Sequence, residues 1–117
     1  MEKLLLTEDI IEKAGKEATN ALKSALSDEL VKVILYGSCA RGDYNADSDL
    51  DIAIITKCDR LKAKKYVNIL AEISTKLAAK YFIVVNFVAI PEQEFLEKRE
   101  WYKYFKNIES EGILLYG

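Results

Sequence analysis

The sequence predicts an α/β (α+β) domain in which helices flank a small, mixed, three-stranded β-sheet. Three apolar runs have the length and the β-branched composition of buried strands, at Leu30–Tyr36, Leu50–Ile55 and Phe82–Ile90. Two longer segments repeat apolar residues at helical spacing. The chain has 117 residues, the size of one domain, so residues 1–117 are expected to form a single unit.

The composition excludes several classes of protein and of catalytic site. Half of the residues are hydrophobic and 31% are charged, which is typical of a globular domain and excludes a disordered chain. The net charge is -2, so a binder of long nucleic acid is not expected. Histidine is absent and the two cysteines are far apart, which excludes catalytic triads and imidazole-based zinc sites. Catalysis would have to use carboxylates, hydroxyls, Lys or Arg, and a hard metal ion.

The N-terminal segment predicts a helix over Thr7–Leu26. Apolar residues recur three and four positions apart, Thr7 suits the N-cap, and two acidic residues follow it. The apolar run before it has three residues, too few for the core of a signal peptide, and no long apolar segment follows. We therefore expect a cytoplasmic protein with no membrane segment.

The connections between the strands predict a mixed sheet. About ten polar residues, with Gly42 and Asn45 as turn formers, join the first two strands. That link is too short for a helical crossover, so these strands should be antiparallel. A helix over Arg60–Lys80, capped by Asp59, would allow a right-handed parallel crossover to Phe82–Ile90.

The C-terminal third predicts two further helices. Pro91 suits the first turn of a short helix through Glu97, and a helix over Trp101–Glu111 should stop at Gly112. The apolar tail Ile113–Tyr116 is either a short edge strand or an extended segment.

The link between the first two strands carries the residues with chemical potential. The first strand ends in Gly37-Ser38, where a glycine lets a ligand approach the backbone and a hydroxyl lies beside unpaired N–H groups, an arrangement suited to phosphate. Arg41 follows on the same turn and could add a charged contact. Asp49 and Asp51 alternate at the start of the second strand, so both carboxylates should share one face. Two such carboxylates suit Mg²⁺, and antiparallel strands would place them opposite Gly37-Ser38.

Each half of this motif has an ordinary structural explanation when taken alone. An isolated Asp-x-Asp is usually a solvated strand end, and a lone Gly-Ser is a still weaker signal. Their conjunction at a spacing of about ten residues favours a cleft for phosphoryl or nucleotidyl transfer.

The stretch Gly37-Ser38-Cys39-Ala40-Arg41-Gly42, followed by Ser48-Asp49-Leu50-Asp51, resembles the signature of the DNA polymerase β-like nucleotidyltransferases. It is most similar to the minimal nucleotidyltransferases, small prokaryotic proteins that consist of the catalytic domain alone. The chain length, the preceding helix and the tail from Tyr104 to Tyr116 resemble the same group, so the similarity covers nearly the whole chain.

The resemblance implies transfer of a nucleoside monophosphate from an NTP, with ATP expected, to an acceptor hydroxyl. Gly37 and Ser38 would hold the distal phosphates, Arg41 would contact phosphate, and Asp49 and Asp51 would bind Mg²⁺. Such proteins are commonly encoded with a helical HEPN-domain partner, and some act as antitoxins that adenylylate a tyrosine of that partner.

Asn86 departs from the superfamily pattern. A third carboxylate is usual on the next strand, and Asn86 is the only polar residue of Phe82–Ile90. An amide oxygen can bind Mg²⁺, but it cannot accept a proton at neutral pH. Asn86 would therefore either take the place of the third carboxylate in the catalytic set or serve only as a hydrogen-bonded polar residue. Glu92 or Glu94 is an alternative candidate for the third carboxylate.

Three hypotheses follow from these residues. The first is a Mg²⁺-dependent nucleotidyltransferase, and the second is a catalytically impaired, antitoxin-like binding subunit. The third is a transferase for small molecules such as aminoglycosides, for which a partner or a homo-oligomer would have to supply the acceptor pocket. Three other features each allow two interpretations. Cys39 in the predicted phosphate loop is either a small filler residue or a reactive thiol, and the lysines at 62, 64 and 65 form either a solvated face or a binding site. The aromatic residues at 101–105 belong either to the core or to an interface with a partner.

Overall fold

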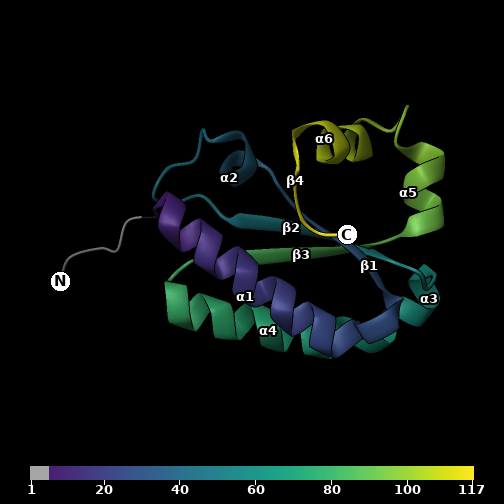
Figure 1. Ribbon diagram of the computed structural model, residues 1–117, viewed down its shortest axis with the longest axis horizontal. Coiled ribbons are helices and arrows are strands. Elements are labelled where there is room, and N and C mark those ends of the chain that lie inside the picture. Colours follow the sequence, from purple (N-terminus) through teal and green to yellow (C-terminus); the bar gives the residue numbers. More distant parts are fainter. Residues whose placement is uncertain (1–5) are drawn as a thin grey trace.

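The computed structural model describes residues 6–117 and contains a mixed four-stranded sheet in the order β3-β2-β1-β4 (Figure 1). β1 (Leu30–Tyr36) pairs antiparallel with β2 (Leu50–Thr56), and β2 pairs parallel with β3 (Val85–Pro91). The mixed topology expected from the lengths of the connections is therefore confirmed. The apolar run at the N-terminus, interpreted as too short for a signal peptide, lies almost wholly outside the described residues.

The sheet has one strand more than expected. β4 (Ile113–Tyr116) pairs antiparallel with β1, which decides between the two interpretations of the C-terminal tail. Gly112 makes the entry into this strand possible, since a Cβ atom there would collide with the Ile108 carbonyl and with the Ile34 side chain.

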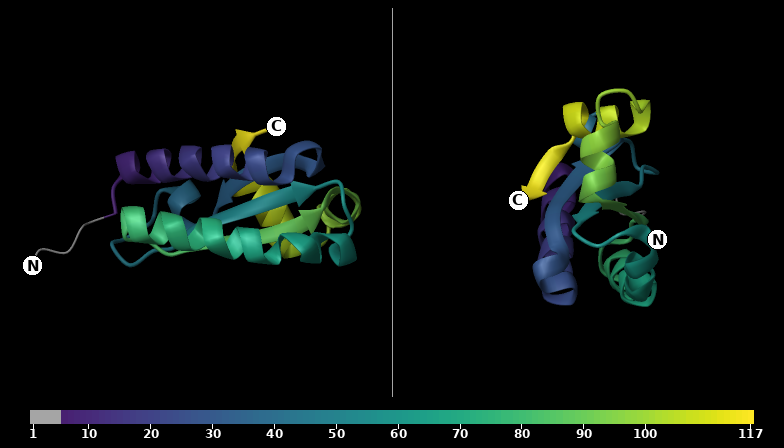
Figure 2. Two further views of the ribbon diagram at one scale, coloured as in Figure 1. Left: turned by 90° about the horizontal axis from the view of Figure 1, so that it is seen from below. Right: turned by 90° about the vertical axis from the view of Figure 1, so that its right-hand side faces the viewer.

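The larger core lies on one face of the sheet, under α1 (Glu8–Leu26) and α4 (Val67–Tyr81), which run alongside each other in Figures 1 and 2. The Thr7 hydroxyl accepts a hydrogen bond of 3.2 Å from the Ile10 N–H, as expected of the N-cap. Side chains that alternate along the strands fill this face, including Leu35, Leu50 and Ile52.

The opposite face carries a smaller core under α5 (Glu92–Lys98) and α6 (Lys103–Glu111). Ile34, Ala53 and Ile90 from the sheet meet Phe95 and Phe105 from these helices. This core covers only part of the face, and the polar residues of the site lie on the remainder.

The predicted helix over Arg60–Lys80 is divided into α3 (Arg60–Ala63), a 3₁₀ turn (Lys64–Tyr66) and α4. Asp59 caps α3 as expected, but the Lys64 N–H already reaches the Leu61 carbonyl, the shorter bond that tightens a helix.

The other boundaries move by a few residues. The third strand begins at Val85 and not at Phe82, because Phe82 adopts a left-handed conformation with φ of 58° and ends α4 by donating to the Ala78 carbonyl. The last helix begins at Lys103, because Tyr102 is extended at its N-cap. Within residues 6–117, none of the helices combines the length and the apolar character needed to cross a membrane.

Candidate active site

The site forms where β1 ends and β2 begins. β1 runs into Gly37, which is the N-cap of the short helix α2 (Ser38–Arg41), and the chain returns through a polar loop to Asp49. In the ladder of paired strands, Tyr36 lies opposite Asp51, and Asp51 lies opposite Asn86 of β3. Directly paired residues project from the same face, so these three side chains emerge side by side.

Asn86 bridges the two carboxylates. Its Nδ2 atom donates to Asp49 Oδ2 and to Asp51 Oδ1, each at 3.1 Å. The structure thus brings together the three residues to which the sequence assigned catalytic roles. The amide hydrogens lie between two anions that would otherwise repel one another, which is also the place that a cation would take.

The donor set fits Mg²⁺. The site offers carboxylate and amide oxygens, which are the ligands that this ion prefers. No cluster of three or more His, Cys, Asp or Glu side chains suited to a metal occurs within residues 6–117, so protein carboxylates would supply only two ligands here. Mg²⁺ commonly accepts this, since it keeps several water molecules and takes further ligands from substrate phosphates. The metal-binding role of Asp49 and Asp51 stays a prediction.

Gly37 is required for two separate reasons. Its φ of 76° lies in the region that side chains disfavour, and a Cβ atom would stand 2.5 Å from Asp51 Oδ2. The Gly37 carbonyl accepts from the N–H groups of Ala40 and Arg41, both at 3.1 Å. The N–H groups of Ser38 and Cys39 belong to the first turn of α2, where a helix has no acceptor of its own to offer. The Gly-Ser turn therefore borders the carboxylates directly.

Cys39 has a structural explanation. Its buried Sγ atom donates to the Asp49 carbonyl at 3.3 Å, which ties α2 to the start of β2. Burial, with a contribution from the charge of Asp51, raises the pKa of the thiol. A thiol held in its neutral form is a poor nucleophile, so the geometry favours the packing role over the reactive one.

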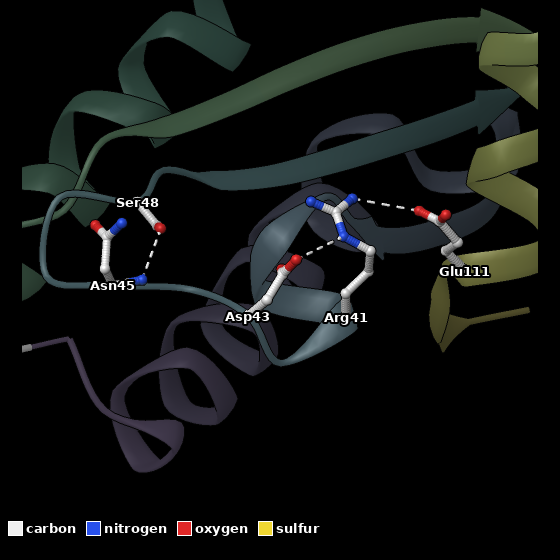
Figure 3. Close-up of polar contacts among 5 residues, drawn as sticks. All are labelled: Arg41, Asp43, Asn45, Ser48 and Glu111. Carbon is white, nitrogen blue, oxygen red and sulfur yellow. Dashed lines mark hydrogen bonds and ion pairs between the residues drawn. The ribbon is translucent and has the colours of Figure 1, made fainter.

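Arg41 is the predicted phosphate contact that the structure directs elsewhere. Its Nε atom lies 3.3 Å from Asp43 Oδ2, and its Nη1 atom lies 3.3 Å from Glu111 Oε2 of α6 (Figure 3). The hydrogen bond from the Asn45 N–H to Ser48 Oγ, 2.9 Å long, shapes the loop beside it. A phosphate contact by Arg41 would require the guanidinium to exchange these carboxylates for the ligand.

Tyr36 and Tyr104 are site neighbours that the sequence interpretation missed. Their hydroxyl oxygens are 2.7 Å apart, and their rings meet edge to face at 6.0 Å between centroids. Burial and the hydrogen bond with Tyr104 raise the pKa of Tyr36 far above its usual value. A signal was present, since Tyr36 is the last strand residue before Gly37 and must share a face with Asp51 once the strands are antiparallel.

Glu92 and Glu94 do not supply a third carboxylate. Both lie in α5, beyond the carboxyl end of β3, whereas Asn86 and the two aspartates lie near the other end of β2 and β3. Glu94 accepts two hydrogen bonds from Arg60, at 2.7 and 2.8 Å. The interpretation in which either glutamate completes the metal site is therefore wrong.

Comparison with known proteins agrees with this geometry. A family model described as a nucleotidyltransferase domain matches residues 16–114, which is most of the chain. The chain belongs to this family. The membership in a nucleotidyltransferase family that the sequence predicted is thus confirmed.

Two relatives of this nucleotidyltransferase come from Methanocaldococcus jannaschii, and both are provisionally named protein adenylyltransferases. One is 40% identical over 105 residues, which cover 90% of this chain and 97% of the relative. The other is 38% identical over 72 residues, which cover 61% of this chain and 70% of the relative.

Solved structures share the fold of this nucleotidyltransferase. A toxin–antitoxin complex with AMP-PNP aligns over 96% of this chain and 74% of its own, with a TM-score of 0.55 and 23% identity. A complex of tri-AMPylated Shewanella oneidensis HEPN toxin with MNT antitoxin aligns over 92% of this chain and 72% of its own, with a TM-score of 0.54 and 18% identity. At these identities the likeness establishes the fold alone.

Proposed function

We propose that this protein transfers AMP from ATP, with Mg²⁺, to a tyrosine hydroxyl of a helical HEPN-type partner protein. The observation that carries the proposal is the junction of two half-sites. The Asp49 and Asp51 carboxylates share a face with Asn86, and the Gly37-Ser38 turn lies against Asp51. The names of the relatives as protein adenylyltransferases, and of structural neighbours as partners of HEPN toxins, support the choice of acceptor.

Each group has a defined part in this proposal. The Ser38 hydroxyl and the first-turn N–H groups of α2 bind the β- and γ-phosphates. Asp49 and Asp51 would hold Mg²⁺, which would neutralise charge on the triphosphate and orient it for attack. The Asn86 amide donates to both carboxylates, and its oxygen would be available as a further ligand of the cation.

The reaction forms a bond between the acceptor oxygen and the α-phosphorus. The bond from that phosphorus to the oxygen bridging to the β-phosphate breaks, and pyrophosphate leaves with the electron pair. No third carboxylate stands beside Asp49 and Asp51 in the described part of the chain, so the acceptor proton passes to water. A phenol ionises far more readily than an aliphatic alcohol, and for this reason the site suits tyrosine.

Asn86 also favours a second candidate function, an antitoxin-like subunit that binds its partner without modifying it. An amide cannot replace a carboxylate as a proton acceptor, and loss of that acceptor would leave the partner-binding surface in place. Binding without transfer distinguishes this alternative from the enzyme.

The test is co-expression with the HEPN-type protein encoded nearest to this gene, followed by mass spectrometry of that protein. AMP on a tyrosine is expected with the wild-type chain. It should be absent with Asp49→Asn or Asp51→Asn, in both of which the Asn86 amide still finds an oxygen acceptor, so thermal stability should hold. Asp28→Asn, an exposed aspartate outside the site, is the matched control and should transfer normally. An unmodified partner that copurifies with the wild-type chain would instead identify the binding subunit.

A further inference from the structure

The outer edge of β3 is open. β3 is the last strand in the sheet order, so among residues 6–117 only one of its sides pairs with another strand. The Val84 carbonyl accepts from the Leu50 N–H, which fixes the groups that face β2. Because backbone groups alternate along a strand, Phe87 and Ala89 direct their N–H and C=O groups outward. Such an edge is a template for a further strand.

The open edge has defined ends. The Val85 carbonyl, which also faces outward, is occupied by the Ser74 hydroxyl at 2.7 Å. At the other end, Pro91 has no N–H to donate. The open stretch of β3 therefore begins at Asn86, the residue that contacts both catalytic carboxylates.

A groove of about 450 Å³ runs beside this edge on the α4 side of the sheet. Val67, Leu70 and Phe87 give it apolar walls, and Arg60 and Lys64 add positive charge. Arg60 is already neutralised by Glu94. Lys64 has no carboxylate within ion-pair distance among residues 6–117, so its charge is available to an acidic side chain of a ligand.

We propose that the acceptor protein presents its tyrosine on an extended segment that adds to the sheet as a fifth strand, along Asn86–Ile90 of β3. The inference rests on the proposed function and specifies how the acceptor is bound. A residue of the added strand that lies directly beside Asn86 would project its side chain from the face of the sheet that carries Asp49 and Asp51. Its two neighbours in sequence would project from the opposite face, into the groove, where Lys64 favours an acidic residue.

The spacing of the strands selects the acceptor side chain. The added strand would lie about 4.8 Å from β3 and about 9.6 Å from β2, which carries Asp51. A serine or threonine hydroxyl lies two bonds from its Cα atom and spans roughly half of one strand spacing. A phenol hydroxyl stands beyond a six-membered ring and spans more than one spacing, so it can pass over Asn86 toward the carboxylates. The edge therefore accepts tyrosine and excludes short alcohols.

The test uses capped heptapeptides of the sequence Thr-Thr-Val-Tyr-Glu-Thr-Thr with Mg·ATP, and mass spectrometry of the product. The wild-type chain should adenylylate the tyrosine at least tenfold faster than a serine at the same position. A lysine in place of the glutamate should slow transfer, and Lys64→Glu should reverse that preference. Equal rates for tyrosine and serine would overturn the argument from reach.

Ala89→Pro tests the edge itself. Proline removes an N–H that faces outward, a change that edge strands tolerate, and Ala89→Ser keeps the N–H as the matched control. We expect at least a tenfold loss of peptide adenylylation for Ala89→Pro, no loss for Ala89→Ser, and Mg·ATP binding unchanged in both. Retention of peptide transfer by Ala89→Pro would overturn the proposal.

A second measurement leaves the protein unaltered. Two versions of the peptide carry N-methyl groups on alternate backbone nitrogens, one version on the odd and the other on the even positions. Only one edge of an added strand pairs with β3, so one version should lose transfer and the other should keep it. Equal effects of both sets of methyl groups would contradict strand addition.

A wild-type chain that binds Mg·ATP but modifies no tyrosine peptide also overturns this inference, whereas absence of Mg·ATP binding overturns the proposed function. A wild-type dimer that Ala89→Pro converts to a monomer, with transfer unchanged, would assign the edge to a second copy of the chain.

Discussion

Asn86 holds the two carboxylates of the site together through its side-chain amide. Two N–H bonds of 3.1 Å offset the repulsion between Asp49 and Asp51, so the site is assembled before any cation arrives. The same residue supplies no negative charge of its own. A site of this kind should bind Mg²⁺ less tightly than a three-carboxylate site, and it should depend more on the phosphates of the nucleotide for ligands.

Replacement of Asn86 by Asp tests this balance. Asp has nearly the same shape, but it removes two hydrogen bonds and places a third anion among two others. Hydrogen bonds to charged groups contribute about 1.5–3 kcal/mol, so we expect the metal-free variant to melt several degrees lower. Mg²⁺ should restore the loss and bind more tightly than to the wild type. Calorimetry with and without Mg²⁺ measures both effects, and a loss that Mg²⁺ does not restore would show that residue 86 does not face the metal.

At the level of single residues, the sequence predicts the site well and the side-chain partners poorly. Spacing along strands places Asp49, Asp51 and Asn86 on one face because side-chain direction follows from the period of the strand. Spacing does not predict where a long side chain ends. Arg41 extends to Glu111, 70 residues away in sequence, because α6 folds back beside α2. Tyr36 of β1 contacts Tyr104 because α6 also packs against β1.

Arg41 and Glu111 join two elements, α2 and α6, through an ion pair of 3.3 Å. Both side chains are about 40% exposed, so the pair itself is worth little to stability. If Arg41 contacts phosphate as predicted, the Glu111 carboxylate would compete with that phosphate for the guanidinium.

Glu111→Gln should therefore raise the affinity for ATP. An exposed ion pair contributes about 0.2–1 kcal/mol, so the expected gain is about 1.4-fold to fivefold in Kd. Titration calorimetry with Mg·ATP measures the gain, and the gain should vanish in an Arg41→Ala background. If the gain persists without Arg41, the competition involves another group.

Tyr36 and Tyr104 join β1 to α6, and we expect this junction to be sensitive to alkali. Burial and the hydrogen bond raise the pKa of Tyr36 in the folded chain above the value of about 10 in the unfolded chain. The folded state therefore holds the proton more tightly. The resulting stability is fully present below about pH 10 and falls as the pH rises above it.

Tyr36→Phe keeps the ring and removes the hydroxyl, so the variant should lose about 1 kcal/mol near neutral pH. Its unfolding free energy should then fall less steeply than that of the wild type above pH 10. Urea denaturation at a series of pH values makes the comparison. Parallel profiles for the two proteins would show that Tyr36 ionises as easily in the folded state as in the unfolded one.

The elements themselves were largely predictable, and the exceptions have physical causes. Apolar periodicity predicts α1, β1 and β2 within a residue, because each is buried on at least one side. The sequence did not distinguish a strand from an extended segment in the C-terminal tail, because a four-residue edge strand depends on a partner strand that is distant in sequence. The division of the second long helix into α3, the 3₁₀ turn and α4 leaves the hydrophobic pattern unchanged and so has no sequence signal.

At the scale of the whole fold, residues 6–117 form two cores of unequal size, separated by the sheet, and the site lies at the margin of the smaller one. Asp51 belongs to the same strand face as Ala53 and Ile55, which help to fill the core under α5 and α6. After the Gly-Ser turn, Cys39 and Ala40 of α2 pack against the core under α1 and α4. A ligand that spans the Gly-Ser turn and the carboxylates therefore holds together groups anchored in both cores.

Binding of Mg·ATP should for this reason stabilise the entire domain in one transition. A ligand that binds only the folded state at 100 times its Kd adds about 2.7 kcal/mol, and in a domain of this size that raises Tm by roughly 10 °C. ATP with a chelator should give a much smaller shift, since the two carboxylates then repel the triphosphate. Asp51→Asn should remove the effect of Mg²⁺, while AMP, which lacks the distal phosphates, should shift Tm little in any variant. Differential scanning calorimetry distinguishes these cases. A large increase in Tm with AMP alone would assign the binding energy to the nucleoside and not to the junction of the Gly-Ser turn with the Asp49 and Asp51 carboxylates.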